Sequence, residues 1–193
     1  EPAAPQFARV EGVEVFAAGL HHGEEYGEAE LDKAVANFHK LKGSLTPTVV
    51  LGHEEDQEIL KNSGIPAAGV VVDLRKVGGK LVADFADVPP AVADLINSRA
   101  YRKVSAEFYP DYEDQGVRHG LTLRRVALLG GEIPEVKSLA DIPLAKFAEA
   151  RRQPTVLCFT EVGQPAPKPQ PVVMFGNYDY RYGKSAPRGG GWE

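Results

Sequence analysis

Cysteine and long apolar runs are nearly absent from this sequence. Cys158 is the only cysteine among 193 residues, so an intrachain disulfide and a thiolate zinc cluster are both excluded. No apolar run approaches the length of about 18 residues that a membrane span needs. We therefore expect no membrane partner. We also expect no signal peptide, because no charged-then-apolar leader opens the chain, which begins at Glu1 without an initiator Met.

Positive charge is also scarce, with 22 Lys and Arg against 27 Asp and Glu and a net charge of −5. A general nucleic-acid binder needs a cationic surface, so we expect no nucleic-acid partner. The charge is unevenly spread: residues 151–193 carry six basic and three acidic side chains, which leaves a net −8 on the first 150 residues. This asymmetry predicts an acidic folded domain over residues 6–150 and a tail of different character over 151–193.

The tail is rich in proline, glycine and aromatic residues. Proline at alternate positions from 165 to 171 predicts a stiff, extended spacer without a core of its own. Apolar and aromatic patches follow at 172–175 and 178–182. A free segment of this composition is expected to be disordered. A partner subunit is the simplest candidate for ordering it, and a homo-oligomer is one such arrangement.

The apolar patterning of residues 6–150 predicts several strands and few helices. Strands are expected at 7–20 (a strand or hairpin), 49–51, 69–75, 80–85, 103–109 and 121–129. Helices are expected at 28–42, from Asp87 to Ile96, and near 144–151. Gly78 and Gly79 are expected to form the turn of the 69–85 hairpin. The pattern indicates an α+β fold: a small curled β-sheet or β-barrel with a few surrounding helices, plus an extended C-terminal tail.

One strand and one loop carry the candidate catalytic residues. The period of two over 103–109 places Ser105 and Glu107 on the same strand face. A serine nucleophile needs a base, and His53 follows a buried strand and precedes the acids of residues 54–56, which can orient an imidazole. The alternatives are a hydrogen-bonded surface serine and a solvated acidic loop, and spacing alone does not decide between these interpretations.

Two further groups of residues are candidates for binding a metal ion or an anion. His53 could share a metal ion with the residues His21, His22, Glu24 and Glu25. Their spacing matches no compact metal motif, so a polar loop is the simpler interpretation, and we expect no metal and no cofactor. Gly130 and Gly131 can present backbone N–H groups to an anion, although a plain turn explains them equally well.

Three ordered segments carry a family resemblance: LGHEEDQ at 51–57, YRKVSAEF at 101–108 and LRRVALLGG at 123–131. Together with the 69–87 hairpin they resemble the capsid maturation (prohead) proteases of tailed phages, in the Mu-type phage protease group. The resemblance covers roughly residues 8–139 and leaves the tail uncovered. The His segment and the Val-Ser-Ala-Glu segment are its most specific parts.

The resemblance implies a fold similar to that of the herpesvirus assembly proteases, a β-barrel ringed by helices. It implies Ser105 as the nucleophile and His53 as the base of a serine endopeptidase that needs no cofactor. The implied substrates and partners are scaffold and capsid proteins, cut in the prohead or virion as it assembles in the host cytoplasm.

The third catalytic residue departs from the family pattern. Arg125 stands before the Val-Ala-Leu strand, where the related enzymes place a histidine or an acid. An arginine stays protonated and cannot accept the imidazole N–H. Glu107 is the nearest carboxylate along the strand, Glu132 and Glu55 are alternatives, and Arg125 itself can stabilise an oxyanion. A Ser–His dyad also remains open.

A second hypothesis follows from this departure and from the tail. The chain would be a non-catalytic structural protein of the virion, a decoration or accessory capsid component built on the protease fold. Its C-terminal tail would anchor it by lying in a neighbour's groove or by adding a strand to a neighbour's sheet.

Overall fold

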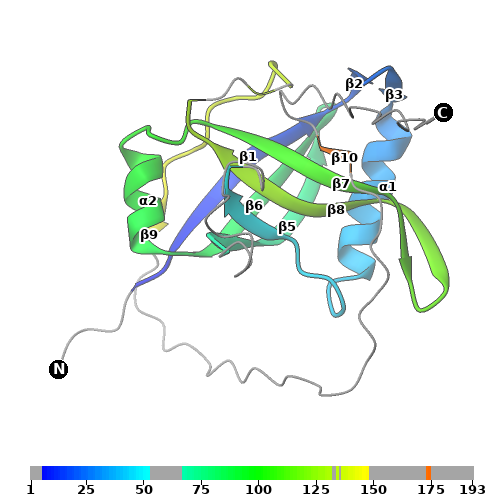
Figure 1. Ribbon diagram of the computed structural model, residues 1–193, viewed down its shortest axis with the longest axis horizontal. Coiled ribbons are helices and arrows are strands. Elements are labelled where there is room, and N and C mark those ends of the chain that lie inside the picture. The colour runs from blue at the N-terminus through cyan, green and yellow to red at the C-terminus, as the bar shows by residue number, and fades with distance from the viewer. Residues whose placement is uncertain (1–5, 53–66, 132–133, 135, 148–172, 175–193) are drawn as a thin grey trace, which may run out of the picture.

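A mixed β-sheet and two helices form the part of the chain that the computed structural model describes, which is residues 6–52, 67–131, 134, 136–147 and 173–174 (Figure 1). The elements in chain order are β1 Ala8–Ala17, β2 Gly19–His21, β3 Glu24–Tyr26, α1 Glu28–Lys40, β4 Thr48–Leu51, β5 Gly69–Val77, β6 Lys80–Val88, α2 Pro90–Asn97, β7 Lys103–Asp114, β8 Val117–Leu129, β9 Lys146–Phe147 and β10 Val173–Met174. The expected α+β class is confirmed.

The main sheet has the strand order β10-β7-β8-β4-β5-β6-β1-β9, and β2 pairs separately with β3. Its pairs are antiparallel except β4 with β8, which run in parallel with Val50 opposite Ala127. The predicted hairpin is confirmed as β5–β6. Gly78 and Gly79 have φ angles of 53° and 72°, a backbone conformation that glycine adopts without a steric penalty.

The sheet does not close into a barrel, so the barrel alternative is wrong. It does curl, which brings β1 and β7 close to each other. β1 and β7 approach each other across the curl, where the ring centroids of Phe16 and Phe108 lie 5.2 Å apart. Among the described residues, no backbone ladder joins these two strands, because β7 pairs outward with β10 and β1 pairs outward with β9. β10 and β9 pair with backbone N–H and C=O groups at the sheet edges, which a closed barrel would pair with each other.

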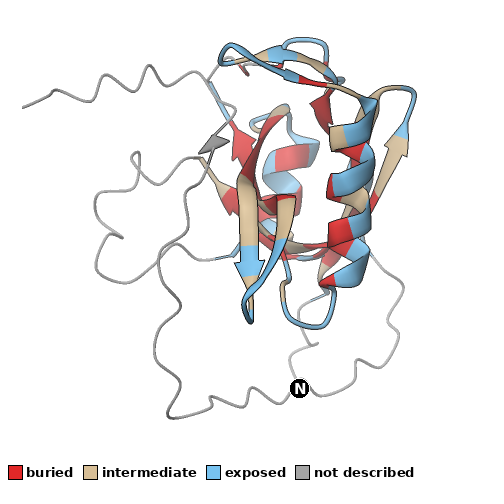
Figure 2. Cartoon of the chain, turned by 90° about the vertical axis from the view of Figure 1, so that its right-hand side faces the viewer, coloured by how far each residue is buried: buried red, intermediate tan, exposed pale blue. Residues whose placement is uncertain are grey.

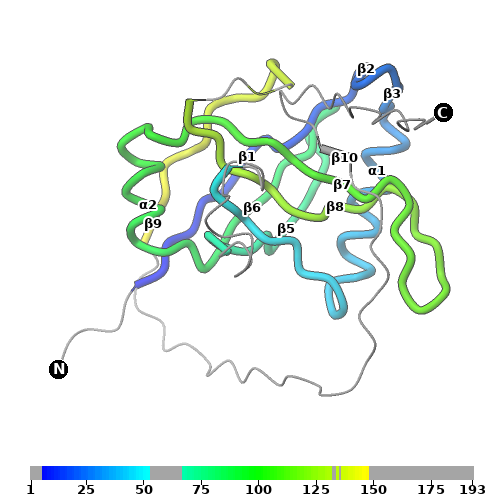
Figure 3. The backbone as a smooth tube through the Cα atoms, in the orientation of Figure 1, coloured from blue at the N-terminus to red at the C-terminus, as the bar shows by residue number. Residues whose placement is uncertain are grey.

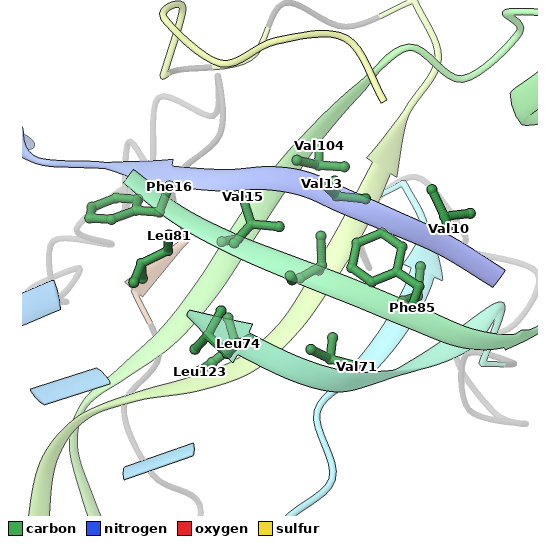
Figure 4. Close-up of a cluster of buried hydrophobic side chains, with 14 of the residues drawn as sticks. Val10, Val13, Val15, Phe16, Val71, Leu74, Leu81, Phe85, Val104 and Leu123 are labelled. Carbon is green, nitrogen blue, oxygen red and sulfur yellow. The ribbon is translucent and has the colours of Figure 1, made fainter. Parts of the chain in front are cut away.

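A hydrophobic core fills the concave side of the curled sheet. Figure 4 shows side chains from β1, β5, β6, β7 and β8 meeting there: Val10, Val13, Val15, Phe16, Val71, Leu74, Leu81, Phe85, Val104 and Leu123. All of these residues are at most 2% exposed. Burial at about 25 cal/mol per Å² of apolar surface makes this cluster the main source of stability.

Helix α1 packs on the sheet through one apolar face and one amide. At its start the Gly27 N–H donates to Glu30 Oε2 at 3.0 Å. Buried and exposed residues alternate around the helix (Figure 2), and Leu31 lies in the core. The Asn37 Nδ2 donates to the carbonyl oxygens of His119 and Leu121 at 2.8 and 2.9 Å, which binds the helix to β8. The predicted helix over 28–42 is therefore confirmed.

The segment from 136 to 147 contradicts the helix predicted near 144–151. Residues 146–147 form β9, paired with Ala8 and Arg9 of β1, and residues 148–151 lie outside the described part. The segment runs alongside α2 (Figure 3), where the Ala145 N–H donates to Asn97 Oδ1 at 2.8 Å. Pairing with β1 and α2 satisfies these backbone groups in an extended conformation, so a helix has no advantage here.

Candidate functional site

Ser105 lies in β7 and is only 2% exposed. It pairs with Ala127 of β8, and Ala127 pairs in turn with Val50 of β4. The side chains of Val50, Ala127 and Leu129 form a small hydrophobic cluster separate from the main core. In the sheet, β8 therefore lies between β7, which carries Ser105, and β4, which ends shortly before His53.

The structure places the start of the His53 loop but not His53, which lies outside the described residues together with Glu55 and Glu132. The last residue described before the loop is Gly52, whose N–H donates to the Leu128 carbonyl oxygen at 3.0 Å. The strands of Ser105 and Gly52 both flank β8, so they are separated by two strand spacings, about 10 Å.

Glu107 is fully buried and binds two arginines through one oxygen. Its Oε2 accepts a hydrogen bond from Arg125 Nε at 2.6 Å and another from Arg124 Nη1 at 3.0 Å. Arg125 is also buried, whereas 28% of the Arg124 side chain is exposed. Glu107 and Ser105 lie two residues apart on β7. The polar network is therefore a direct neighbour of the candidate nucleophile along the strand.

A β-bulge explains how two consecutive arginines reach the same carboxylate. Glu107 pairs with Arg125, but the next pair joins Phe108 to Leu123, so Arg124 is an extra residue in β8. In a regular strand, consecutive side chains point to opposite faces. A bulge sets two residues against one and redirects a side chain, which lets both guanidinium groups meet Glu107. The Arg124 guanidinium also lies 5.9 Å from the ring centre of Tyr109.

Within the part of the chain that the structure describes, the network joins two guanidinium groups to one carboxylate. Glu107, which holds both arginines, is two residues along β7 from Ser105. Burial strengthens such charge interactions, because the protein interior screens them less than water does. The prediction that Arg125 lies near the site is consistent with this geometry, and the structure adds Arg124, which the sequence analysis missed.

His21, Glu24 and Glu25 lie in the small β2–β3 sheet, and His53, the other residue considered with them for a metal ion, lies outside the described residues. His21 Nε2 lies 2.9 Å from the Ala17 carbonyl oxygen, and its ring packs against Phe16 and Tyr26. Within the described ranges, no group of three or more His, Cys, Asp or Glu side chains could hold a metal ion. The same part of the chain contains no helix long and apolar enough to cross a membrane.

Gly130 and Gly131 follow β8 and are exposed, close to the level at which β4 ends. Their backbone groups lie at the same end of the sheet as Gly52.

A comparison of the chain with protein-family models, with curated proteins and with solved structures finds no match in any of the three.

Proposed function

We propose that the chain is a serine endopeptidase of tailed-phage capsid maturation, which cuts scaffold and capsid proteins during head assembly. Ser105 is the nucleophile and His53 is the base. The observation that carries the proposal is the position of Ser105, two residues along β7 from a buried carboxylate that holds two arginines, and two strands from the strand that leads to His53. The resemblance in segments 51–57, 101–108 and 123–131 supports the same residues.

In the proposed reaction, His53 removes the hydroxyl proton while Ser105 Oγ forms a bond to the peptide carbonyl carbon. The tetrahedral intermediate collapses, the C–N bond breaks, and the protonated His53 gives its proton to the leaving amine. Water then attacks the acyl-enzyme with His53 as the base, which releases the acid product and restores Ser105. In this scheme the guanidinium groups held by Glu107 stabilise the oxyanion. Gly130 is three residues along the chain from the β8 partner of Ser105, about 10 Å away, so its N–H is not assigned to this role.

Glu107 has a different role in this scheme from the one the sequence analysis considered. Its Oε2 holds Arg124 and Arg125, so the carboxylate fixes two cations beside the nucleophile. We therefore assign Glu107 as a positioning residue for the arginines. A Ser–His dyad supported by this charge needs no third carboxylate on the imidazole.

One observation favours the second function, a non-catalytic structural protein of the virion. Ser105 is 2% exposed, and a nucleophile has to reach a peptide carbonyl. In that alternative, Ser105, Glu107 and Arg125 only stabilise the packing of the domain. The tail attaches the domain to neighbouring subunits in the shell.

The test is the variant Ser105→Ala in the full chain, co-expressed with the cognate scaffold and capsid proteins. Cleavage is expected to disappear while the melting temperature stays within a few degrees of the parent. Thr122→Val is the matched control, because Thr122 is an equally buried hydroxyl residue on β8 whose Oγ1 donates to the Gly120 carbonyl oxygen. Cleavage should persist in that control. Unchanged processing by Ser105→Ala, with the protein retained in stoichiometric amounts in mature particles, would establish the structural function instead.

A further inference from the structure

The outer edge of β7 is paired with a segment from far along the chain. Val173 of β10 lies opposite Phe108, and Met174 lies opposite Glu107, in antiparallel register (Figure 1). The connection from β9 to β10 is residues 148–172, a length of 25 residues. The pairing is therefore an addition of a separate segment to the sheet edge and not a hairpin.

The paired position is directly beside the candidate nucleophile. β7 runs from Lys103 through Ser105 to Asp114, and β10 begins opposite Phe108 and proceeds toward Glu107. A strand continued in this register reaches the level of Ser105 two positions beyond Met174. Any extended peptide bound at this edge in the same direction thus passes Ser105 with its backbone alongside β7.

The edge is suited to a ligand that can be exchanged. A β10 of two residues offers few backbone hydrogen bonds, each worth about 0.5–1.5 kcal/mol net. The segment belongs to the same chain, so its pairing is intramolecular and can persist although each contact is weak. A strand that binds the edge more tightly, or that is present at high local concentration, can therefore displace it. Backbone pairing of this kind accepts many sequences, because the hydrogen bonds come from groups that every residue except proline carries.

We propose that the outer edge of β7 at Glu107–Phe108 is a binding site for an extended apolar peptide, and that Val173–Met174 is its internal occupant. The occupant blocks the edge until a substrate strand replaces it, a consequence that rests on the proposed endopeptidase function. The binding site itself does not depend on that function. It needs only the backbone pairing groups of an edge strand and a segment in antiparallel register.

The test opens the edge in the full chain without removing the tail. The double substitution Val173→Pro and Met174→Pro is made in the Ser105→Ala background, so that no cleavage occurs. Proline has no N–H, so it cannot donate to β7. The control, Val173→Ala with Met174→Ala in the same background, keeps both N–H groups. The probe is a fluorescein-labelled peptide of residues 170–178 (QPVVMFGNY), followed by fluorescence anisotropy.

The peptide is expected to bind the proline variant at least about tenfold more tightly than the parent or the alanine control, because the internal competitor is weakened. The same peptide with proline at both central positions should not bind. Equal affinity for all three proteins, or binding of the proline peptide, would overturn the proposal. Amide hydrogen exchange gives a second measurement: the backbone at Glu107–Phe108 should exchange faster in the proline variant, and unchanged protection there would also overturn it.

These results are separable from those of the cleavage test. Peptide binding is measured in chains without the Ser105 hydroxyl, so it is unaffected if the endopeptidase function fails. If the function holds, Val173→Pro with Met174→Pro in the chain that retains Ser105 should cleave the cognate substrate faster than the parent. Loss of cleavage by Ser105→Ala together with an edge that binds no peptide would leave the function standing and remove only the internal occupant.

Discussion

At the scale of single residues, Glu107 shows how a local irregularity sets the electrostatics of a site. Its charge is buried, and a buried charge has to be paired. The bulge in β8 supplies two guanidinium groups to the same oxygen, Arg125 Nε at 2.6 Å and Arg124 Nη1 at 3.0 Å. Removing one partner of a buried pair leaves the other partner's charge without compensation, which costs more than the pair itself contributes.

We therefore expect Glu107→Leu and Arg125→Met each to reduce the free energy of unfolding by about 3–5 kcal/mol. The double variant should be much more stable than the sum of the two losses, because neither charge remains buried alone and Arg124 is partly exposed to water. Urea unfolding at pH 7 measures all four proteins. Arg124→Met is the control and should cost less than Arg125→Met. Strict additivity of the first two substitutions would contradict this account of the network.

The sequence predicted part of this site and could not predict the rest. The period of two correctly placed Ser105 and Glu107 on one strand, and Arg125 was expected at the site. Arg124 was missed because the period of two assigns it to the opposite face, and only the pairing register reveals the bulge. A pair of arginines opposite a single acid was the available signal. The pairing of Ser105 with His53 stays a prediction.

At the scale of elements, local patterns predicted the strands and helices best where one period dominated. The 69–88 hairpin and helix α1 are of this kind. Strand β7 continues to Asp114, beyond the predicted end at 109, because a register shift between Tyr109 and Tyr112 accommodates Pro110 and Asp111. β9 was mistaken for a helix because two residues carry no readable period, and their pairing with β1 depends on residues far away in the sequence.

Two carboxylates attach the 136–145 segment to the rest of the molecule. Glu14 Oε2 accepts from Lys80 Nζ and from the Ala140 N–H, each at 2.7 Å. The hydrogen bond from Lys80 is the main cause that lowers the pKa of Glu14. Arg102 and Lys103 bind Asp141 at 2.7 and 3.0 Å. The hydrogen bond from Arg102 is the main cause that lowers the pKa of Asp141 to about 2.

Because both pKa values are lower in the folded state, these groups stabilise the fold fully above their unfolded pKa values of 4.5 and 3.8. That stabilisation is lost as the pH falls through the folded pKa values, toward pH 2 for Asp141. We expect the melting temperature to fall below about pH 4, and Glu14→Gln with Asp141→Asn to show a shallower fall. Glu25→Gln, at an exposed position in β3, is the control. Parallel acid profiles for the double variant and the parent would refute the assignment.

At the scale of the whole molecule, the sheet is held in its curl by side chains where a barrel would use backbone hydrogen bonds. Strand pattern alone does not separate these two architectures, since both need the same alternation of apolar residues. The difference lies in the pairing order, in which β8 inserts between β7 and β4, and β10 and β9 occupy the outer edges. The pairings of β8 with β4, of β10 with β7 and of β9 with β1 each join distant parts of the chain, so no local pattern predicts them.

If side chains hold the curl, the rings of Phe16 and Phe108 should be energetically coupled. Their centroids lie 5.2 Å apart at an interplanar angle of 60°, and both are fully buried. We expect a double-mutant cycle of Phe16→Leu and Phe108→Leu, measured by urea unfolding, to give a coupling of about 0.5–1.5 kcal/mol. Phe16→Leu with Val117→Ala is the control pair and should be additive, because Val117 is half exposed at the start of β8. A coupling no larger than that of the control would contradict this account. The approach of β1 to β7 would then result from the twist of the strands themselves, without a contribution from the contact between the two rings.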